Sequence, residues 1–283
     1  MNMEDLIAGI VEAAKQNNPL AEGDYEKDGI LYCGKCHTPK EHIDRFIDIG
    51  RKLPCLCECR QRELEAEEQR KRQEERQDYI RRLRQRGFPE SQMERWTFDQ
   101  DDGKNPRLSD IARKYVEKFD EINKGLLLFG GVGVGKSFIA ACIANALIDK
   151  GHPVLMTNLQ RITNTMMGMY EGRQEYLDDL DRFDLLIIDD LGAERETEYM
   201  AEAVQNIVDS RYRCGKPLIV TTNLTGDELK HPADLRKART YSRLYEMCYP
   251  VEVQGEDRRR KALKSQYDEL SEILGIRKEN KNE

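Results

Sequence analysis

Short apolar runs alternate with amphipathic stretches in the chain from Gly125 onward. Apolar runs without polar alternation are typical of strands that are buried on both faces. The pattern predicts strands at Gly125–Phe129, Pro153–Thr157, Leu185–Asp189 and Pro217–Thr222, and helices at Ser137–Lys150 and Glu196–Arg213. Strands that alternate with helices in this way favour a parallel sheet with helices on both faces. We therefore predict the α/β fold class for this part of the chain.

The stretch before Gly125 has a different composition. A short apolar-periodic segment, Leu6–Val11, precedes a cysteine-rich stretch, and residues 59–86 are mostly Glu, Arg, Lys and Gln. Such a composition favours a solvated helix with opposite charges three and four residues apart, acting either as a spacer or as an arm that touches a partner or DNA. Gly87-Phe88-Pro89 ends this helix. We predict three parts: an N-terminal module at 1–58, a charged helical linker at 59–87 and the α/β domain at 88–283.

The overall composition is that of a polar chain. Its 283 residues are 35% charged, carry a formal net charge of −7 and have a mean hydropathy of −0.77. A net negative charge argues against a protein that coats nucleic acid, so we expect any DNA contact at a local basic patch. No run approaches the roughly 18 apolar residues that span a bilayer. The acidic start, Met1–Asp5, lacks the segments of a secretory signal. We therefore expect a cytoplasmic protein with no membrane partner.

A glycine-rich loop lies between the first predicted strand and the helix that follows it. It matches the phosphate-loop pattern G-x-x-x-x-G-K-[ST] and consists of Gly130, Gly131, Val132, Gly133, Val134, Gly135, Lys136 and Ser137. Glycines let the backbone fold around phosphates with its N–H groups turned inward, and the start of the helix adds positive potential. We expect Lys136 to reach the β- and γ-phosphates of ATP and the Ser137 hydroxyl to bind Mg²⁺.

Polar residues end the third and fourth predicted strands. Four apolar residues precede Asp189 and Asp190, and the fourth strand runs into Asn223. The carboxyl ends of parallel strands lie at the same edge of a sheet, where ligands bind. We therefore expect these polar residues to lie beside the phosphate loop. We assign Asp189 to Mg²⁺, through water, and Asp190 to deprotonating or orienting the attacking water. Asn223 would position that water against the γ-phosphate. Glu194 is near enough in sequence to assist.

Five of the eight cysteines fall between Cys33 and Cys59. In a reducing compartment such clusters are more often metal ligands than disulfides. Two tight groups of cysteines can close a tetrahedral Zn²⁺ site and hold together a segment with little apolar core. We favour Cys33, Cys36, Cys57 and Cys59 as the ligands, with Cys55 as the spare or alternate and His37 or His42 as substitutes for one of them.

Two other chemistries match the first cysteine pair less completely than zinc does. Cys33-Gly-Lys-Cys36-His37 fits the attachment motif of c-type haem, and Cys-x-x-Cys also occurs in redox proteins. Haem attachment takes place outside the cytoplasm and leaves the second cysteine group without a role. Redox pairs usually open a helix in a thioredoxin-like unit, which is absent from the pattern here. Zinc therefore explains more of the cluster.

Together these motifs resemble a known family. The phosphate loop, the segment 185–194, the Thr-Thr-Asn strand end at 221–223 and Tyr241-Ser-Arg-Leu-Tyr-Glu246 are similar to segments of the AAA+ ATPases of the DnaC/DnaI type. These are bacterial and phage replicative helicase loaders, and the transposition helper IstB is a close relative. The resemblance covers about residues 88–262. It implies an AAA+ fold with a central parallel sheet, ATP as ligand and a hexameric, DnaB-type helicase as partner.

The resemblance also implies roles for two arginines. Arg243 matches an arginine finger, which completes the site of a neighbouring subunit and implies self-assembly, or assembly on the helicase. Arg258 matches a sensor arginine that reports on the nucleotide of its own subunit, a role for which Arg259 and Arg260 compete. The usual acid-then-glutamate pair of the family is Asp-Asp here. This departure puts fast hydrolysis in doubt and leaves ATP binding unaffected.

These inferences combine into one leading hypothesis. We predict an ATPase that loads a replicative helicase onto single-stranded DNA, with the zinc module binding the helicase. The alternatives are an IstB-like helper of a transposase on duplex DNA, a small-molecule P-loop kinase, and a nucleotide-binding interaction module with little turnover. The cysteine module weighs against the first alternative. The Asp-Asp and Thr-Thr-Asn motifs fit a hydrolysing switch better than a kinase.

Overall fold

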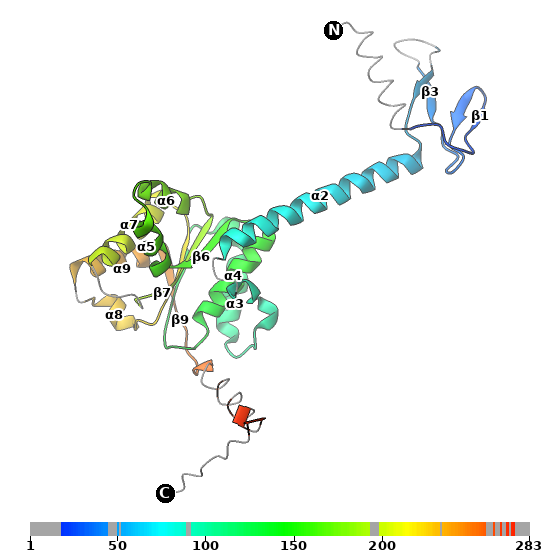
Figure 1. Ribbon diagram of the computed structural model, residues 1–283. Coiled ribbons are helices and arrows are strands. Elements are labelled where there is room, and N and C mark those ends of the chain that lie inside the picture. Colours follow the sequence, from blue (N-terminus) through cyan, green and yellow to red (C-terminus); the bar gives the residue numbers. More distant parts are fainter. Residues whose placement is uncertain are drawn as a thin grey trace. The chain divides into compact units, whose positions relative to one another are not determined.

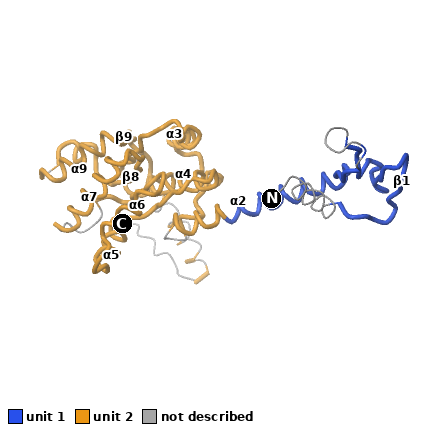
Figure 2. Tube along the Cα trace, turned by 90° about the horizontal axis from the view of Figure 1, so that it is seen from above, with its two compact units in different colours: residues 1–78 blue, residues 79–283 orange. Residues whose placement is uncertain are grey.

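The computed structural model describes residues 18–44, 50, 52–88, 92–192, 198–232 and 234–258, with scattered residues from 263 to 274. The segment Leu6–Val11, Glu194, Arg259 and Arg260 lie outside the described residues. The chain divides into two compact units, Met1–Asp78 and Tyr79–Glu283 (Figure 2). Within the described part of the chain, no helix is both long enough and apolar enough to cross a membrane.

The first unit contains two short antiparallel strand pairs, which the sequence analysis did not predict. They are formed by β1 (Tyr25–Lys27) with β2 (Ile30–Tyr32) and by β3 (Glu41–Ile43) with β4 (Lys52–Pro54). Among the described residues of this unit, Cys33 and Cys57 are the only buried apolar side chains. Within the described part of this unit, burial of apolar surface therefore contributes little to stability.

A buried ion pair ties the loops of the first unit together. Lys40 Nζ lies 2.6 Å from Asp24 Oδ2, and both side chains are 3% exposed. The backbone N–H groups of Ala21 and Gly34 donate to the same carboxylate, at 2.9 and 3.0 Å. The hydrogen bond from Lys40, followed by those from the two N–H groups, lowers the pKa of Asp24 to about 2. The described contacts of the unit are thus largely polar, which is the kind of segment that a bound metal ion can hold together.

Helix α2 (Glu58–Gly87) is a single helix of 30 residues, as the charge pattern predicts. Exposed ion pairs four residues apart lie along it, such as Glu58–Arg62 at 3.1 Å. Leu83 and Gly87, close to its C-terminal end, are the only buried residues of the helix, all of which is described. A Cβ added at Gly87 would lie 2.5 Å from the carbonyl oxygen of Val154, so only glycine fits this approach.

The second unit is built on a parallel sheet flanked by helices (Figure 1). The sheet has five strands in the order β6-β7-β8-β5-β9. The strands are β5 (Gly125–Phe129), β6 (Val154–Asn158), β7 (Leu185–Leu191), β8 (Leu218–Thr222) and β9 (Cys248–Glu252). The predicted α/β class is confirmed, and four of these strands were predicted. The edge strand β9 was missed because its Pro250 and its mixture of buried and exposed positions break the apolar run.

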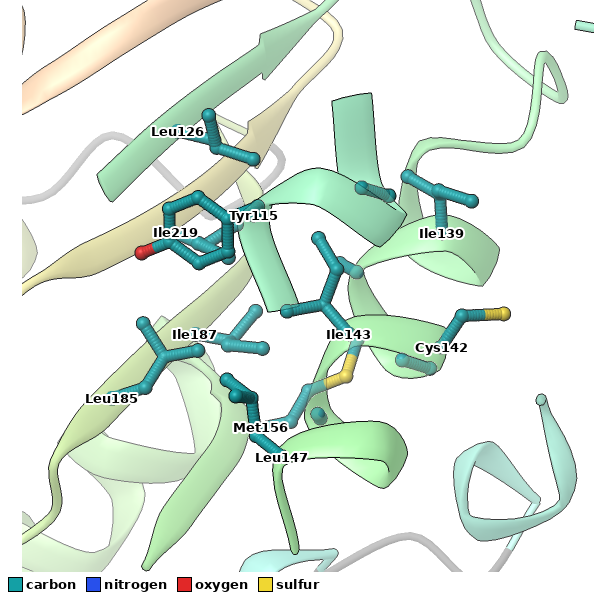
Figure 3. Close-up of a cluster of buried hydrophobic side chains, with 14 of the residues drawn as sticks. Tyr115, Leu126, Ile139, Cys142, Ile143, Leu147, Met156, Leu185, Ile187 and Ile219 are labelled. Atoms are coloured by element: carbon teal, nitrogen blue, oxygen red, sulfur yellow. The ribbon is translucent and has the colours of Figure 1, made fainter. Parts of the chain in front are cut away.

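Helices cover both faces of the sheet. They are α3 (Pro106–Glu117), α4 (Lys136–Lys150), α5 (Leu159–Gly168), α6 (Arg173–Leu180), α7 (Glu198–Cys214), α8 (Gly226–Lys230) and α9 (Leu235–Met247). Helices α3 and α4 form one hydrophobic core with the sheet, drawn in Figure 3, and α5 to α9 form the other. Leu126 and Leu128 of β5 join the first core, whereas Leu127 joins the second. This alternation follows from the pleat of the strand.

A buried arginine fastens α7 to the sheet. Arg211 is 0% exposed. Its guanidinium donates to the backbone carbonyls of Phe183 at 3.0 Å, Asp184 at 3.3 Å and Pro217 at 2.7 Å. These carbonyls immediately precede β7 and β8, so one side chain fixes the positions at which two central strands begin.

Candidate functional site

The glycine-rich loop connects β5 to α4 and requires its glycines. Gly130, Gly133 and Gly135 have φ angles of 144°, 75° and 101°, which residues with a Cβ rarely adopt. A Cβ at Gly130 would lie 2.3 Å from the carbonyl oxygen of Val253, and one at Gly133 would lie 1.9 Å from Oδ1 of Asp257. The loop therefore needs glycine for its backbone conformation, and also because the segment that packs against it leaves no room for a Cβ atom.

Lys136 is the first residue of α4, and its side chain turns back into the loop. The residue is 5% exposed. Its Nζ donates to the carbonyl oxygens of Gly130 at 3.0 Å and Gly131 at 2.7 Å, and to Asn223 Oδ1 at 2.8 Å. The ammonium group is thus held between the loop and the residue that follows β8. A phosphate oxygen is a stronger, charged acceptor for the same donor.

Asp189 and Asp190 lie in a β-bulge near the C-terminal end of β7. The register between β7 and β8 shifts between Ile188 and Leu191, so that both aspartates lie opposite Thr221. The Thr221 hydroxyl donates to Asp189 Oδ1 at 2.6 Å and accepts from the Asp190 N–H at 2.9 Å. The φ of Asp190 is 55°, a left-handed conformation that aspartate tolerates better than most residues. Asp189 is consequently buried, whereas Asp190 is exposed.

One cavity of about 270 Å³ brings most of the predicted catalytic and binding groups together. Its lining residues are Trp96, Val132, Gly133, Gly135, Lys136, Ser137, Phe138, Asp190, Asn223 and Arg258. Asp189 does not line the cavity but is linked to it through Thr221 and its neighbour Asp190. The cavity thus combines a phosphate loop, a lysine, a hydroxyl, a carboxylate and an arginine. This is the set of groups by which proteins bind a nucleoside triphosphate with Mg²⁺.

Arg258 is held at the cavity by its backbone and by its side chain. Its N–H donates to the carbonyl oxygen of Gly133 at 3.0 Å, and Nη1 lies 3.1 Å from Asp102 Oδ1. Lys104, and more weakly Arg258, hold the pKa of Asp102 below its usual range. The position of Arg258 is compatible with the sensor role that we predicted, which stays a prediction.

Arg243 lies apart from these residues. It belongs to α9, forms an ion pair with Asp209 of α7, and its guanidinium carbon is 5.8 Å from the centre of the Tyr212 ring. Arg243 does not line the cavity that contains Lys136. Its arginine-finger role stays a prediction.

Four sulfur atoms meet in the first unit. The Sγ atoms of Cys33, Cys36, Cys57 and Cys59 all lie within 4.8 Å of one another. Cys59 Sγ is 3.5 Å from the sulfurs of both Cys33 and Cys57, and a tetrahedral Zn²⁺ with bonds of about 2.3 Å places its sulfurs roughly 3.8 Å apart. Cys55 Sγ instead lies 3.5 Å from the Pro39 carbonyl oxygen. The four sulfurs thus fit a structural zinc site of the composition favoured from the sequence.

The thiols of this cluster influence one another's ionisation. The Thr38 hydroxyl lies 3.0 Å from Cys36 Sγ, and this hydrogen bond is the main reason that the pKa of Cys36 falls to about 5. Cys57, followed by Cys33, raises the pKa of Cys59 to about 12. The thiolate is therefore favoured at Cys36 and disfavoured at Cys59, whereas a divalent cation would stabilise the thiolate at all four positions.

Four residues in or beside the cavity were not identified from the sequence, namely Trp96, Asp102, Phe138 and Thr221. Trp96 lines the cavity and Asp102 pairs with Arg258 beside it. Both residues precede α3 and come to the site only through tertiary folding, so no local pattern marks them. Thr221 did carry a signal. It lies two positions before Asn223, and residues two apart on a strand share a face. A polar residue there could have been placed beside the Asp189 carboxylate.

The fold and the cavity define a P-loop nucleotide-binding protein of the α/β class. Residues 59–266 match the model of a family described as IstB-like ATP binding protein. This match spans more than half of the chain, and the chain belongs to that family.

Known relatives agree with the predicted DnaC/DnaI resemblance, which is confirmed. The chain is 33% identical over 122 residues to the replicative helicase loader DnaC of Escherichia coli (strain K12), a match that covers 42% of this chain and 50% of the relative. It is 28% identical over 182 residues to the replicative helicase loader DnaI of Bacillus subtilis (strain 168), over 58% of each chain. A crystal structure of DnaI superimposes with a TM-score of 0.52 and 25% identity, covering 62% of this chain and 99% of that one. The chain thus matches about half the length of the curated DnaC relative.

Proposed function

We propose that this chain is an ATPase that loads a DnaB-type replicative helicase hexamer onto single-stranded DNA and uses ATP as its switch. Membership of an ATP-binding family and the similarity to DnaC and DnaI support the proposal. The observation that carries it is the single cavity in which the phosphate loop meets Asp190, Asn223 and Arg258. A switch that responds to the γ-phosphate needs its binding loop, its base and its sensor in one place.

In this proposal each group at the cavity has a separate task. The loop N–H groups and Lys136 bind the phosphates, and Ser137 and Asp189 hold Mg²⁺. When bound, Mg²⁺ neutralises charge on the β- and γ-phosphates, and hydroxyl and carboxylate oxygens are the ligands it prefers. Asp190 accepts the proton of the attacking water, and Asn223 orients that water.

The contact between Lys136 and Asn223 gives the switch a physical basis. Lys136 Nζ donates to Asn223 Oδ1 at 2.8 Å. A γ-phosphate that draws the ammonium toward itself weakens this hydrogen bond, so the end of β8 responds to the nucleotide. Asp190 is one methylene shorter than glutamate and has its N–H fixed by Thr221. We therefore expect ATP hydrolysis to be slow relative to ATP binding, as suits a timing device.

The remaining parts of the chain would serve assembly. The four clustered thiols would bind Zn²⁺ and hold the module at 1–58, which would bind the helicase in the cytoplasm. The linker at 59–87 would connect it to the ATPase domain at 88–283. Arg243 would act on the nucleotide of a neighbouring subunit, and Arg258 on that of its own subunit.

Complex formation with a purified hexameric replicative helicase tests the proposal. Size-exclusion chromatography with ATP, with ADP and after zinc removal should give a stable complex with ATP. Deletion of residues 1–58 should abolish the complex, and Lys136→Ala should remove its response to nucleotide. Absence of a complex in every nucleotide state would refute the loader function. A transposase with duplex DNA would then be tested, because the family is described by its IstB-like members.

A further inference from the structure

The nucleotide cavity has an aromatic wall that belongs to none of the nucleotide-binding motifs. Trp96 lines the cavity beside Val132, Lys136 and Phe138. Its ring centre lies 6.1 Å from that of Phe138, with the ring planes tilted by 51°, and the residue is partly exposed. An aromatic surface at the edge of a phosphate-binding site can pack against the base or ribose of a nucleotide.

Asn145 sets the position of Trp96. It lies in the middle of α4, the helix that begins with Lys136, and is 1% exposed. Its Nδ2 donates to the carbonyl oxygens of Trp96 at 2.9 Å and Met93 at 3.1 Å. The same Nδ2 lies 3.1 Å from the Ala141 carbonyl oxygen of its own helix, and the Met93 carbonyl also accepts from the Trp96 N–H at 3.2 Å. The buried amide thus tethers the Trp96 backbone to α4, because a buried amide or carbonyl left without a partner is unfavourable.

Helix α2 contacts the same amide through Arg84. Arg84 Nη1 donates to Asn145 Oδ1 at 2.7 Å, and Nη2 pairs with Asp149. The Arg84 side chain is 24% exposed. The bond to Oδ1 matters for the whole tether because it fixes which way the amide faces, and hence where Nδ2 points. A series of hydrogen bonds thus leads from the last turn of α2 through Asn145 to the wall of the cavity.

We propose that Trp96 contacts the bound nucleotide and that Arg84 and Asn145 are positioning residues, which make the placement of Trp96 depend on the seating of α2 against α4. The inference rests on the proposed binding of ATP. By thermodynamic linkage, bound ATP should then stabilise the packing of the C-terminal end of α2 against α4. That packing should in turn raise the affinity for ATP by the same factor. The element coupled to the ATP site is therefore the C-terminal end of α2, which contains Arg84 and ends at Gly87.

Trp96 is the only tryptophan of the chain, so its fluorescence reports on the wall directly. Addition of ATP with Mg²⁺ to the full chain should shift the Trp96 emission and reduce its quenching by acrylamide. Trp96→Ala should weaken ATP binding, measured by calorimetry, on the order of tenfold, which is the loss typical of an aromatic stacking partner. Trp96→Phe keeps a ring at the position and should retain most of the affinity.

Arg84→Met tests the positioning residues, because it keeps the aliphatic stem and removes the donors. It should weaken ATP binding several-fold and increase the acrylamide quenching of Trp96 before ATP is added. Arg82→Met is the matched control, since Arg82 is an exposed arginine two residues earlier on the same helix. It should change neither measurement. A merely structural role of Arg84 would lower thermal stability without altering the quenching of Trp96.

The outcomes separate this inference from the proposed function. A wild-type chain that fails to bind ATP with Mg²⁺ overturns both. A wild-type chain that binds ATP without any change in Trp96 emission or quenching, together with full affinity in Trp96→Ala, overturns the inference and leaves ATP binding intact. If Trp96→Ala fails to fold, the inference is tested by the fluorescence response of the wild-type chain to ATP and by the ATP affinity of Trp96→Phe. No change in the wild-type emission or quenching on ATP binding would then overturn it.

Discussion

Replacing Thr221 with valine removes the hydroxyl that links the two aspartates of the β-bulge. Thr221 is 0% exposed, and its Oγ1 makes the bonds of 2.6 Å to Asp189 and 2.9 Å from Asp190. Valine has nearly the same volume, so the change leaves no cavity. A hydrogen bond to a charged group contributes about 1.5–3 kcal/mol and a neutral one about 1 kcal/mol. The free energy of unfolding should therefore fall by roughly 2.5–4 kcal/mol.

Urea unfolding followed by the Trp96 fluorescence measures this loss, and thermal unfolding gives a second reading. For a unit of this size each 1 kcal/mol lowers Tm by about 2–4 °C, so Thr221→Val should lower it by roughly 5–15 °C. Phosphate release should fall more than ATP affinity, because Thr221 contacts Asp189 and Asp190, whereas the proposed function assigns nucleotide binding to the phosphate loop.

Thr221→Ser is the matched control because it keeps the hydroxyl and loses one methyl group. It should cost only about 1 kcal/mol and retain hydrolysis. If the valine and serine variants unfold at the same urea concentration and release phosphate at the same rate, the two hydrogen bonds do not hold the bulge, and the reasoning is refuted.

Three further predictions concern other residues. Arg243→Ala should leave the ATP affinity of the isolated chain unchanged and lower phosphate release only in an assembled complex, because Arg243 lies outside the cavity of its own subunit; equal phosphate release by assembled wild-type and variant chains would contradict the arginine-finger role. Cys57→Ser should lower the zinc content measured by mass spectrometry and Cys55→Ser should not, since Cys57 is one of the four clustered sulfurs and Cys55 is not. The same zinc content in both variants would contradict the ligand assignment. Arg211→Met should lower the free energy of unfolding in urea by about 3–5 kcal/mol, because it removes a fully buried guanidinium whose donors satisfy the partly buried carbonyls of Phe183, Asp184 and Pro217. A methionine variant as stable as the wild-type chain would show that these carbonyls find other partners.

Contiguous patterns in the chain predicted a large part of this molecule. The continuous apolar runs predicted four strands because strands buried on both faces need no polar alternation. The charge composition predicted α2, and the phosphate-loop pattern predicted a turn that only glycines can form. The strands β1 to β4 and β9 were not predicted. Each is short or carries exposed positions, so its pairing depends on neighbours that are distant along the chain.

The sequence by itself determined the class of the protein, its phosphate loop, the residues at the ends of β7 and β8, and a cysteine set suited to zinc. Each of these follows from residues a few positions apart, whose spacing fixes their geometry. Only the tertiary structure decided that Thr221 joins the two aspartates, that Arg258 lines the cavity while Arg243 does not, and that Trp96 is tethered by Asn145 and Arg84. These contacts join segments that are far apart in the chain. Their formation depends on packing and on hydrogen bonds of buried polar groups, and no local pattern encodes either.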